Sequence, residues 1–324
     1  MNISFRTESW PLEAPFRISG AEWSAIGSIV VRVEHGGHVG RGEAQGVDYL
    51  GETLSSMCDQ VAAISDFLAR DPSRSALQEL LPPGGARNAI DCALWDLECK
   101  QSGQSIWELT GIEPRSLATA YTIGLEGTPE AMARKAAACA APLLKVKLDR
   151  DRPYQKLAAV RTARPDARLV VDANQGWDFP LLRQLIPRLA ELGVEMVEQP
   201  LPRGEDAVLE GLDCPIALAA DESCQHRGEL APAARRYQVI NIKLDKAGGL
   251  TEALRLAAAA RERGCSLMAG NMIGTSLAMA PAFVVAQLCD FVDLDGPVLL
   301  RRDRAHGLAY DRGTVHAPDP RLWG

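Results

Sequence analysis

Seven polar side chains recur about every 25 residues from position 147 onward, each near the end of a short apolar run. They are Lys147, Asp172, Glu198, Asp221, Lys246, Asn271 and Asp295, separated by 25, 26, 23, 25, 25 and 24 residues. One strand, one turn and one covering helix need a stretch of about this length, so each successive strand would deliver one reactive group to the same rim. This is the design of a (β/α)₈ barrel, whose active site lies at the carboxyl ends of its parallel strands.

The charge balance and the apolar runs argue against two kinds of partner. The net charge is −7, from 35 basic and 42 acidic residues, whereas nucleic-acid binding usually requires a basic patch. The segment MNISFRTESWPLEAPF lacks the basic and apolar regions of a signal peptide. The longest apolar stretches, such as residues 277–289, are shorter than the roughly 20 residues that span a bilayer. We therefore expect a small-molecule ligand, no nucleic acid and no membrane.

The cysteine pattern predicts a reducing compartment. The chain has eight cysteines, and none of them forms a CxxC pair that would indicate zinc or a redox site. Scattered cysteines in apolar context behave as small hydrophobic residues. A cytoplasmic location is therefore expected.

The N-terminal third predicts a separate α+β unit. Residues 27–34 (GSIVVRVE) alternate like a strand, and HGGH after them predicts a hairpin turn. Residues 54–81 and 86–101 have apolar side chains at helical spacing. We expect residues 1–115 to form a capping domain.

From residue 117 onward, strand-like and helix-like runs alternate. The strand-like runs are TAYTIG, LLKVKLD, LVVDAN, EMVEQP, IALAADES, VINIKLDK, SLMAGN and FVDLDGP. Eight near-equal units with right-handed crossovers predict a closed α/β barrel over residues 116–300. An open doubly wound sheet is the alternative. Residues 301–324 are too many for a loop, and we expect them to return to the capping domain.

Three carboxylates end consecutive predicted strands: Asp172, Glu198 and Asp221. Three unpaired carboxylates on one rim would repel one another unless a hard cation were bound, and oxygen-only ligands fit Mg²⁺ better than zinc. Capping of a helix N-terminus is the alternative role for any one of them. Glu222, which follows Asp221, competes for the third ligand position.

Two lysine pairs flank the carboxylates in sequence. Lys145 and Lys147 have the same strand parity in LLKVKLD and so face the same side. Lys243 and Lys246 in INIKLDKAGG have opposite parity, and spacing alone leaves open which of them enters the site. A lysine near a metal and a second ammonium has a lowered pKa and can act as a general base. A surface position is the alternative for each.

The eighth predicted strand ends in two carboxylates of equal parity, Asp293 and Asp295 in VDLDGP. With three metal ligands already in place, this pair suits a cationic group of a substrate. A capping or salt-bridged pair is the alternative.

These motifs together resemble those of the enolase superfamily, muconate-lactonizing subgroup. LLKVKLD is similar to the KxK motif of that subgroup, VDAN, VEQP and ADES to its metal-ligand motifs, and INIKLDKAGG to its second lysine motif. VDLDGP resembles the DxD motif of the dipeptide epimerases of the L-Ala-D/L-Glu type, which binds an α-ammonium group. The resemblance covers nearly the whole chain.

The resemblance implies a role for each matching residue. One Mg²⁺ per subunit would be held by Asp172, Glu198 and Asp221, and Lys147 and Lys246 would be the acid and the base. The implied substrate-binding residues are Lys145, Asp293, Asp295, Thr122 and Asn271. Self-association into a homo-oligomer is left open.

The implied activity is a Mg²⁺-dependent dipeptide epimerase that inverts the α-carbon of the C-terminal residue of an L-Ala-Xaa dipeptide. A metal stabilises the enediolate that α-proton removal creates, and two bases on opposite faces carry out the 1,1-proton transfer. The alternatives are an N-acylamino acid racemase, an o-succinylbenzoate synthase or a cycloisomerase, which have no use for the DxD pair. A catalytically silent barrel that binds a metabolite or a protein is the alternative from another class, and the complete set of metal ligands and lysines argues against it.

Two segments of the capping domain resemble specificity loops. The segment PFRISGAEWSAIGS contains Gly20, Ala21, Glu22 and Trp23. The resemblance implies an arginine there that pairs with a glutamate side chain, and this chain has none at Gly20, Ala21 or Glu22. A neutral, hydrophobic or cationic second residue is therefore expected. The second segment, QGVDYLGET, offers Asp48 and Tyr49 as contacts.

Overall fold

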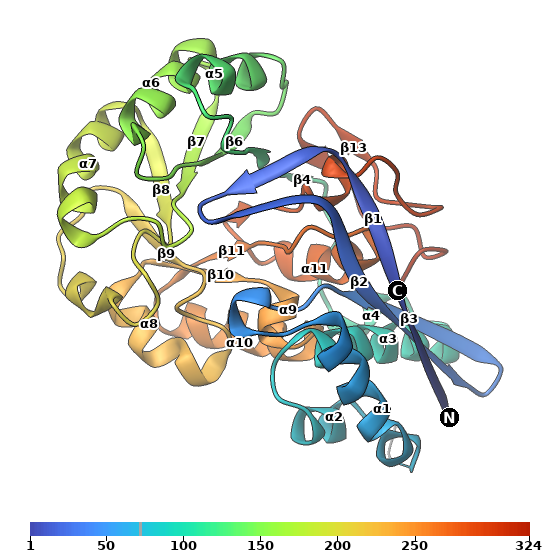
Figure 1. Cartoon of the computed structure of the whole chain (residues 1–324). Coiled ribbons are helices and arrows are strands. Elements are labelled where there is room, and N and C mark those ends of the chain that lie inside the picture. Colours follow the sequence, from blue (N-terminus) through green and yellow to red (C-terminus); the bar gives the residue numbers. More distant parts are fainter. Residues whose placement is uncertain (71–72) are drawn as a thin grey trace.

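The computed structural model describes residues 1–70 and 73–324. The strands of these residues form three sheets. The first is an antiparallel sheet in the order β1-β2-β3, covered by three helices (Figure 1). Its elements are β1 (Asn2–Ile18), β2 (Ala21–His35), β3 (His38–Ala44), α1 (Leu54–Arg70), α2 (Arg74–Leu80) and α3 (Gly85–Ser102). A short helix, α4 (Ile106–Thr110), leads away from this unit.

Helix α3 lies directly on β3 because two positions of the strand have no side chain. A Cβ atom at Gly40 would lie 2.0 Å from the carbonyl oxygen of Ala93, and one at Gly42 would lie 2.1 Å from that of Ala89. Both distances are far inside van der Waals contact, so only glycine permits this approach. The resulting contact closes the core of the capping unit.

The second sheet has eight parallel strands in the order β12-β11-β10-β9-β8-β7-β6-β5. They are β5 (Tyr121–Ile123), β6 (Leu143–Lys147), β7 (Arg168–Asp172), β8 (Val194–Glu198), β9 (Ala217–Ala220), β10 (Val239–Ile242), β11 (Ser266–Ala269) and β12 (Phe291–Val292). The amide of Ala120 donates to the carbonyl oxygen of Val292 at 2.8 Å, which links the first strand to the last and closes the barrel. The predicted barrel and its eight strands are confirmed.

Strand alternation sorts the side chains between the barrel interior and the helical shell. Leu144 and Val146 of β6 belong to the large core that the surrounding helices cover. Leu143 belongs to a small cluster of inward side chains that fills one end of the barrel; the others are Ala120, Val170, Met196, Ala219, Val239 and Met268. Because successive side chains alternate, Lys145 and Lys147 also point inward, nearer the carboxyl end.

The covering helices follow the strands in turn. They are α5 (Pro129–Ala137), α6 (Pro153–Ala163), α7 (Phe179–Glu191), α8 (Leu230–Arg236), α10 (Leu250–Glu262) and α11 (Ser276–Ala286). The connection between β8 and β9 departs from the regular repeat, because it contains only the 3-10 turn η2 (Asp206–Leu209). This connection is also where the spacing of the polar residues falls to 23.

The C-terminal tail contacts both parts of the chain. β13 (Tyr310–Asp311) and β14 (Thr314–Val315) form the third sheet with β4 (Leu117–Ala118). The indole of Trp323 is buried and donates to the carbonyl oxygen of Cys92 in α3 at 3.0 Å. The division at residues 115 and 300 stays a prediction, and these contacts support it.

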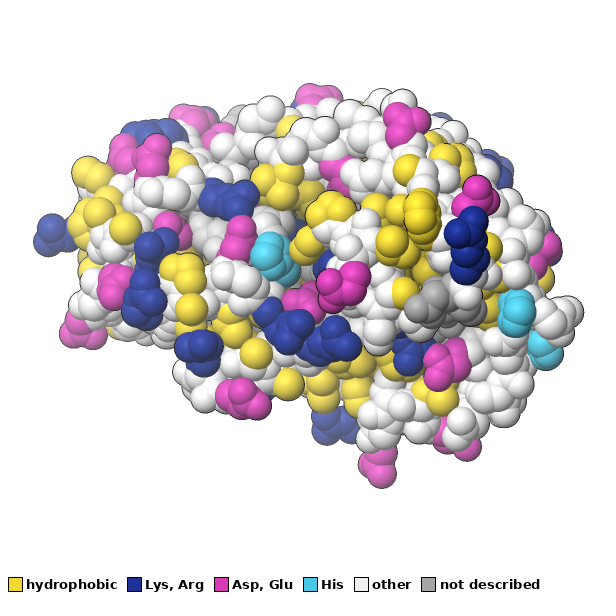
Figure 2. Space-filling model, turned by 90° about the horizontal axis from the view of Figure 1, so that it is seen from below, with side chains coloured by type: hydrophobic (Ala, Val, Ile, Leu, Met, Phe, Trp, Pro, Cys, Tyr) yellow, Lys and Arg dark blue, Asp and Glu magenta, His cyan; other side chains and the backbone are white. Residues whose placement is uncertain are grey.

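The surface charges, the helix hydropathy and the state of the cysteines can be compared with the sequence. On the face shown in Figure 2, basic and acidic side chains are interspersed. Among the helices in residues 1–70 and 73–324, none is long and apolar enough to cross a membrane. All eight cysteines are free thiols.

Candidate active site

The candidate site lies at the carboxyl ends of the barrel strands, beneath the hairpin formed by β1 and β2 (Figure 1). A cavity of about 230 Å³ opens there. Its barrel side is formed by Lys147, Asn174, Asp221, Glu222, Lys243 and Asn271, and its roof by residues of the hairpin and of the segment around Tyr49. Of the seven residues of the 25-residue period, Lys147, Asp221 and Asn271 therefore meet at this cavity.

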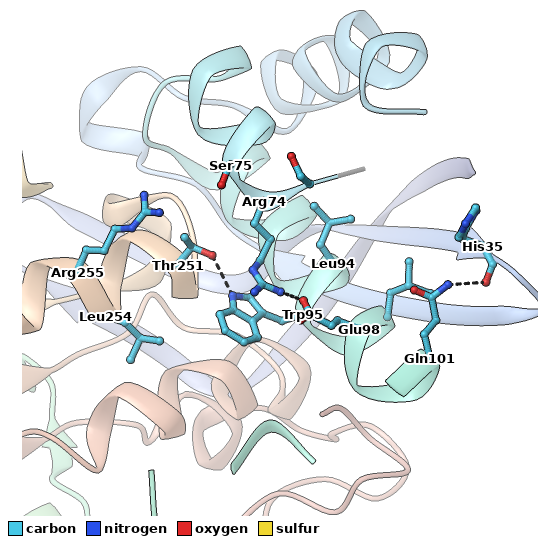
Figure 3. A pocket seen from close by; sticks show the side chains of 12 residues that line it. His35, Arg74, Ser75, Leu94, Trp95, Glu98, Gln101, Thr251, Leu254 and Arg255 are labelled. Carbon is cyan, nitrogen blue, oxygen red and sulfur yellow. Dashed lines mark hydrogen bonds and ion pairs between the residues drawn. The ribbon is translucent and has the colours of Figure 1, made fainter. Parts of the chain in front are cut away.

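A larger hollow of about 640 Å³ lies between α2, α3 and α10 (Figure 3). The guanidinium of Arg74 lies 3.5 Å from the centre of the Trp95 ring and pairs with Glu98. The indole of Trp95 donates to the hydroxyl of Thr251 at 3.0 Å. Because the Trp95–Thr251 hydrogen bond joins the capping unit to the barrel, we interpret the hollow as a seam between them and place the active site in the smaller cavity.

Lysines and carboxylates alternate in space across the barrel interior. Lys145 Nζ lies 3.0 Å from Asp172 Oδ2, 2.8 Å from Glu198 Oε2 and 2.8 Å from Asp293 Oδ2. Lys147 Nζ lies 2.7 Å from Asp172 Oδ2 and donates to Asn174 Oδ1 at 2.9 Å. On the other side of the barrel interior, Lys243 Nζ donates to Asp221 Oδ2 at 2.6 Å.

The pKa values of these groups reflect burial and mutual charge. Burial alone would raise the pKa of Asp172, but Lys147 and Lys145 outweigh it and lower the pKa to about 2. Burial and then the charge of Asp172 raise the pKa of Glu198 to about 7. Burial lowers the pKa of Lys145, but its carboxylate partners, Asp293 first, raise it well above its ordinary value. The cluster therefore holds several charges whose ionisation depends on one another.

Buried oxygens of Glu198 and Asp221, two of the three predicted metal ligands, and of the neighbouring Glu222 fit a hard cation. Glu198 Oε2, Asp221 Oδ1 and Glu222 Oε2 are buried and accept no hydrogen bond, and such atoms are costly to leave unpaired. Glu198 Oε2 and Asp221 Oδ1 each have only an ammonium group at 2.8 Å. Within residues 1–70 and 73–324, no three acidic, histidine or cysteine side chains already surround one point, because lysines lie between the carboxylates. Glu222 lines the cavity beside Asp221, so both stay candidates for the third ligand.

The structure reverses the choice between the two lysines after β10. Lys243 lines the cavity, whereas Lys246 is fully buried and donates to the carbonyl oxygens of Asp221, Cys224 and Asn241 at 2.6, 3.0 and 2.9 Å. Lys246, the lysine expected to be an acid/base residue, thus lies away from the cavity, and Lys243 is the candidate in its place. β10 ends at Ile242, and the chain turns into α9 (Leu244–Ala247), which carries Lys246 away from the cavity.

Among the residues predicted to bind substrate, Asn271 lines the cavity, whereas Asp293 and Asp295 lie outside its lining. Asn271 Nδ2 donates to the carbonyl oxygen of Asp293 at 2.6 Å. Asp293 Oδ1 is buried without a hydrogen bond, so it has an acceptor free for a donor. Asp295 Oδ2 instead accepts the amide of Thr122 at 2.7 Å, and burial followed by the charge of Asp293 raises the pKa of Asp295 to about 7. The structure thus places Asp293 nearer to the lysine–carboxylate cluster than Asp295.

The segment expected to be a loop is the tip of the β1–β2 hairpin. Trp23 lines the cavity, but Gly20, Ala21 and Glu22 line a separate surface hollow. Arg17 forms an exposed ion pair with Glu22 at 2.8 Å. The expectation that Gly20, Ala21 and Glu22 contact the ligand is therefore not supported.

The second cap segment does reach the cavity. Asp48 and Tyr49 of η1 (Asp48–Leu50) line it. The hydroxyl of Tyr49 lies 3.0 Å from Gln225 Nε2, which in turn donates to the carbonyl oxygen of Glu222.

Some cavity residues were missed by sequence reasoning. Asn174 was quoted only as part of VDAN, although its polar side chain two residues after a strand end was a usable signal. Phe16, Ile18 and Ile26 were not singled out, and the alternation of FRI on a hairpin strand could have indicated them.

Comparison with known proteins gives a consistent picture. Residues 1–111 match the sequence model of the mandelate racemase / muconate lactonizing enzyme N-terminal domain, and residues 129–321 match that of the enolase C-terminal domain-like family. The L-Ala-D/L-Glu epimerase of Escherichia coli is 44% identical over 313 residues, which are 95% of this chain and 97% of that protein. An N-acetyl-D-glutamate racemase of Pseudoalteromonas is 41% identical over 87% of this chain and 91% of that protein.

Two solved structures are also similar. An enolase family member from Agrobacterium tumefaciens with homology to dipeptide epimerases, with bound sodium and L-Ala-L-Glu, has a TM-score of 0.97 and 42% identity, covering 100% of this chain and 99% of that one. A dipeptide epimerase from Methylococcus capsulatus, complexed with Mg and L-Arg-D-Lys, has a TM-score of 0.89 and 31% identity, covering 100% and 99% of the two chains.

Proposed function

Because this chain belongs to the mandelate racemase / muconate lactonizing enzyme family, we propose that it is a Mg²⁺-dependent dipeptide epimerase. The substrate is an L-Ala-Xaa dipeptide, and the reaction inverts the α-carbon of its C-terminal residue. The cytoplasm as its compartment and self-association stay predictions.

One observation carries the proposal: two lysines face one cavity from opposite walls of the barrel. Lys147 ends β6, the second strand of the barrel, and Lys243 follows β10, the sixth. In a closed barrel of eight strands, the second and sixth lie across from each other. Two bases on opposite sides of one carbon are what an inversion by proton transfer needs.

The metal site is proposed on the buried carboxylates. Asp172 and Glu198 end β7 and β8, and Asp221 follows β9. When bound there, Mg²⁺ supplies a Lewis acid for the negative charge that develops on the substrate carboxylate. Asn241 Nδ2 donates to Glu198 Oε1 at 2.8 Å and so orients this ligand.

The chain's own residues then move the proton. One of the two lysines removes the α-proton from one face, and the other delivers a proton to the opposite face; the reverse reaction exchanges their roles. Asp293, with Asp295 behind it, receives the α-ammonium group, and Lys145 lies beside the carboxylates as a fixed positive charge. The hairpin roof excludes water from the cavity.

The test uses single-lysine variants and α-proton exchange in D₂O with Mg²⁺. Lys147→Ala and Lys243→Ala should each lose inversion by at least about 10²–10⁴-fold, the usual contribution of one acid/base group. Each variant should still exchange deuterium into the one epimer whose α-proton faces the remaining lysine. Inversion at the wild-type rate in either variant would refute the assignment.

A racemase of N-acylamino acids is the second candidate, favoured by the 41% identity to such an enzyme. It has no ammonium group to bind, so Asp293→Asn should leave it unaffected. For the epimerase the same variant should lose activity with L-Ala-Xaa, because a buried carboxylate partner of the ammonium is removed. Comparing one dipeptide with its N-acetylamino acid analogue separates the two.

A further inference from the structure

We infer that the cavity selects dipeptides whose second residue has an apolar side chain. The inference rests on the proposed function and specifies the substrate of the same site. It separates this chain from relatives that are named for glutamate.

The hairpin register decides which side chains face the cavity. Phe16 pairs with Trp23 across β1 and β2, Arg17 pairs with Glu22, and side chains alternate between the two faces of the hairpin. Phe16, Ile18 and Trp23 therefore share the face that lines the cavity. Arg17 and Glu22 lie on the other face, where they neutralise each other at 2.8 Å in an exposed pair.

The apolar roof continues beyond the hairpin tip. Ile26 of β2, with Met272 and Ile273 after β11, completes the apolar lining. Phe16 and Ile26 also belong to a buried cluster with Leu12 and Leu300, against which the other hairpin side chains pack. The roof is thus anchored in a packed core and presents a shaped apolar surface to the ligand.

The cations of the lining are already engaged. Among the described residues that line the cavity, the basic ones are Lys147 and Lys243, and each is bound to a carboxylate of the proposed metal site. An acidic substrate side chain turned toward the roof would find no cation among the described residues that form it. Burying a charge without a partner is unfavourable, whereas burying an apolar side chain against this roof is favourable.

A cationic side chain is the weaker alternative. Asp48 is the acidic residue that the capping unit contributes to the lining, and it is exposed at the rim. Its Oδ1 already accepts the amide of Tyr49 at 2.8 Å. Besides Asp48, the roof contributes the uncharged polar side chains of Gln45 and Tyr49, and its other side chains are apolar.

The experiment measures kcat/KM of the Mg²⁺-loaded wild-type enzyme by α-proton exchange with L-Ala-L-Leu, L-Ala-L-Phe, L-Ala-L-Glu and L-Ala-L-Lys. We expect the best apolar dipeptide to exceed the glutamate and lysine dipeptides by roughly 10–200-fold, the range that apolar pockets reach. If L-Ala-L-Glu or L-Ala-L-Lys is the best substrate, the inference is overturned and the proposed function stands. If no dipeptide exchanges, the proposed function falls as well.

Two variants of the hairpin sharpen the result. Trp23→Arg places a cation on the cavity face and should raise the ratio of kcat/KM for L-Ala-L-Glu over L-Ala-L-Leu at least tenfold. Arg17→Gln is the matched control, because it removes the cation of the outer face; its ratio should stay within about twofold of wild type. A loss of glutamate turnover in Arg17→Gln would mean that Arg17 reaches the substrate and would contradict the inference.

Discussion

Replacing Lys246 by methionine separates a structural lysine from a catalytic one. Its ammonium group is buried and donates to the carbonyl oxygens of Asp221, Cys224 and Asn241, and it lies 2.8 Å from Asp221 Oδ1. Losing three hydrogen bonds to buried acceptors costs about 1 kcal/mol each or more. The variant also leaves the buried carboxylate of Asp221 without this ammonium partner, and breaking a buried ion pair costs about 3–5 kcal/mol in measured cases. We therefore expect Lys246→Met to lower the free energy of unfolding by at least about 3–5 kcal/mol, the figure for the ion pair alone.

The assay is urea unfolding of Lys246→Met and Lys243→Met beside wild type, all with Mg²⁺, together with activity per folded molecule. Lys246→Met should unfold at a clearly lower urea concentration and keep measurable inversion while folded. Lys243→Met should show the opposite pattern, a nearly complete loss of inversion with a smaller change in stability. The reasoning is refuted if Lys246→Met unfolds like wild type and has lost inversion.

Four further predictions concern stability and the proposed metal site. Burial raises the pKa of Asp245 in the folded protein to about 6. The folded protein then holds this proton more tightly than the unfolded chain, so the free energy of unfolding falls as pH rises from about 4 to about 6. Asp245→Asn should flatten this decline, which is about 3 kcal/mol at most, in urea titrations. The pKa of Asp91 is likewise raised to about 6 by burial, so Asp91→Asn should flatten the decline in the same way. Gly42→Ala should lower the melting temperature by several degrees because its Cβ would overlap the Ala89 carbonyl oxygen at 2.1 Å; an unchanged melt would contradict the packing of α3 on β3. Chelation of Mg²⁺ should abolish exchange and lower the melting temperature, since a ligand at 100 times its Kd adds about 2.7 kcal/mol; identical melts with and without the metal would count against the site.

The barrel could be predicted because its signal is periodic and local. Asp172 and Glu198 each end a strand in the structure, as the period requires. The same period failed at the sixth strand, where it selected Lys246, four residues beyond the strand end at Ile242. The better signal was alternation: in VINIK, Asn241 and Lys243 share parity, and Asn241 Nδ2 bonds to Glu198 inside the barrel. Two polar residues at one parity that alternate with isoleucines indicate an inward face.

The face of the hairpin that meets the barrel could not be predicted, because it depends on the pairing register and on how the capping unit docks. Nothing local in PFRISGAEWSAIGS reveals that Phe16 pairs with Trp23 or that Arg17 is held by Glu22. Those facts follow from the hairpin register, and a shift of one residue would exchange the two faces. The composition of the roof, and with it the specificity, is therefore a property of register and docking.

The six residues from Lys243 to Gly248 explain why the lysine choice was difficult and tie the cap to the chemistry. Lys243 faces the cavity, and two residues later Asp245 Oδ1 accepts the amides of Gln45 and Gly46 of the capping unit, both at 2.9 Å. The carbonyl oxygens of Ala247 and Gly248 accept Arg87 of α3 at 2.7 and 3.1 Å. Lys246 fastens the same segment to the barrel. This short segment carries a proposed acid/base lysine and is bonded both to the capping unit and to the barrel wall. A displacement of the capping unit should therefore also move Lys243.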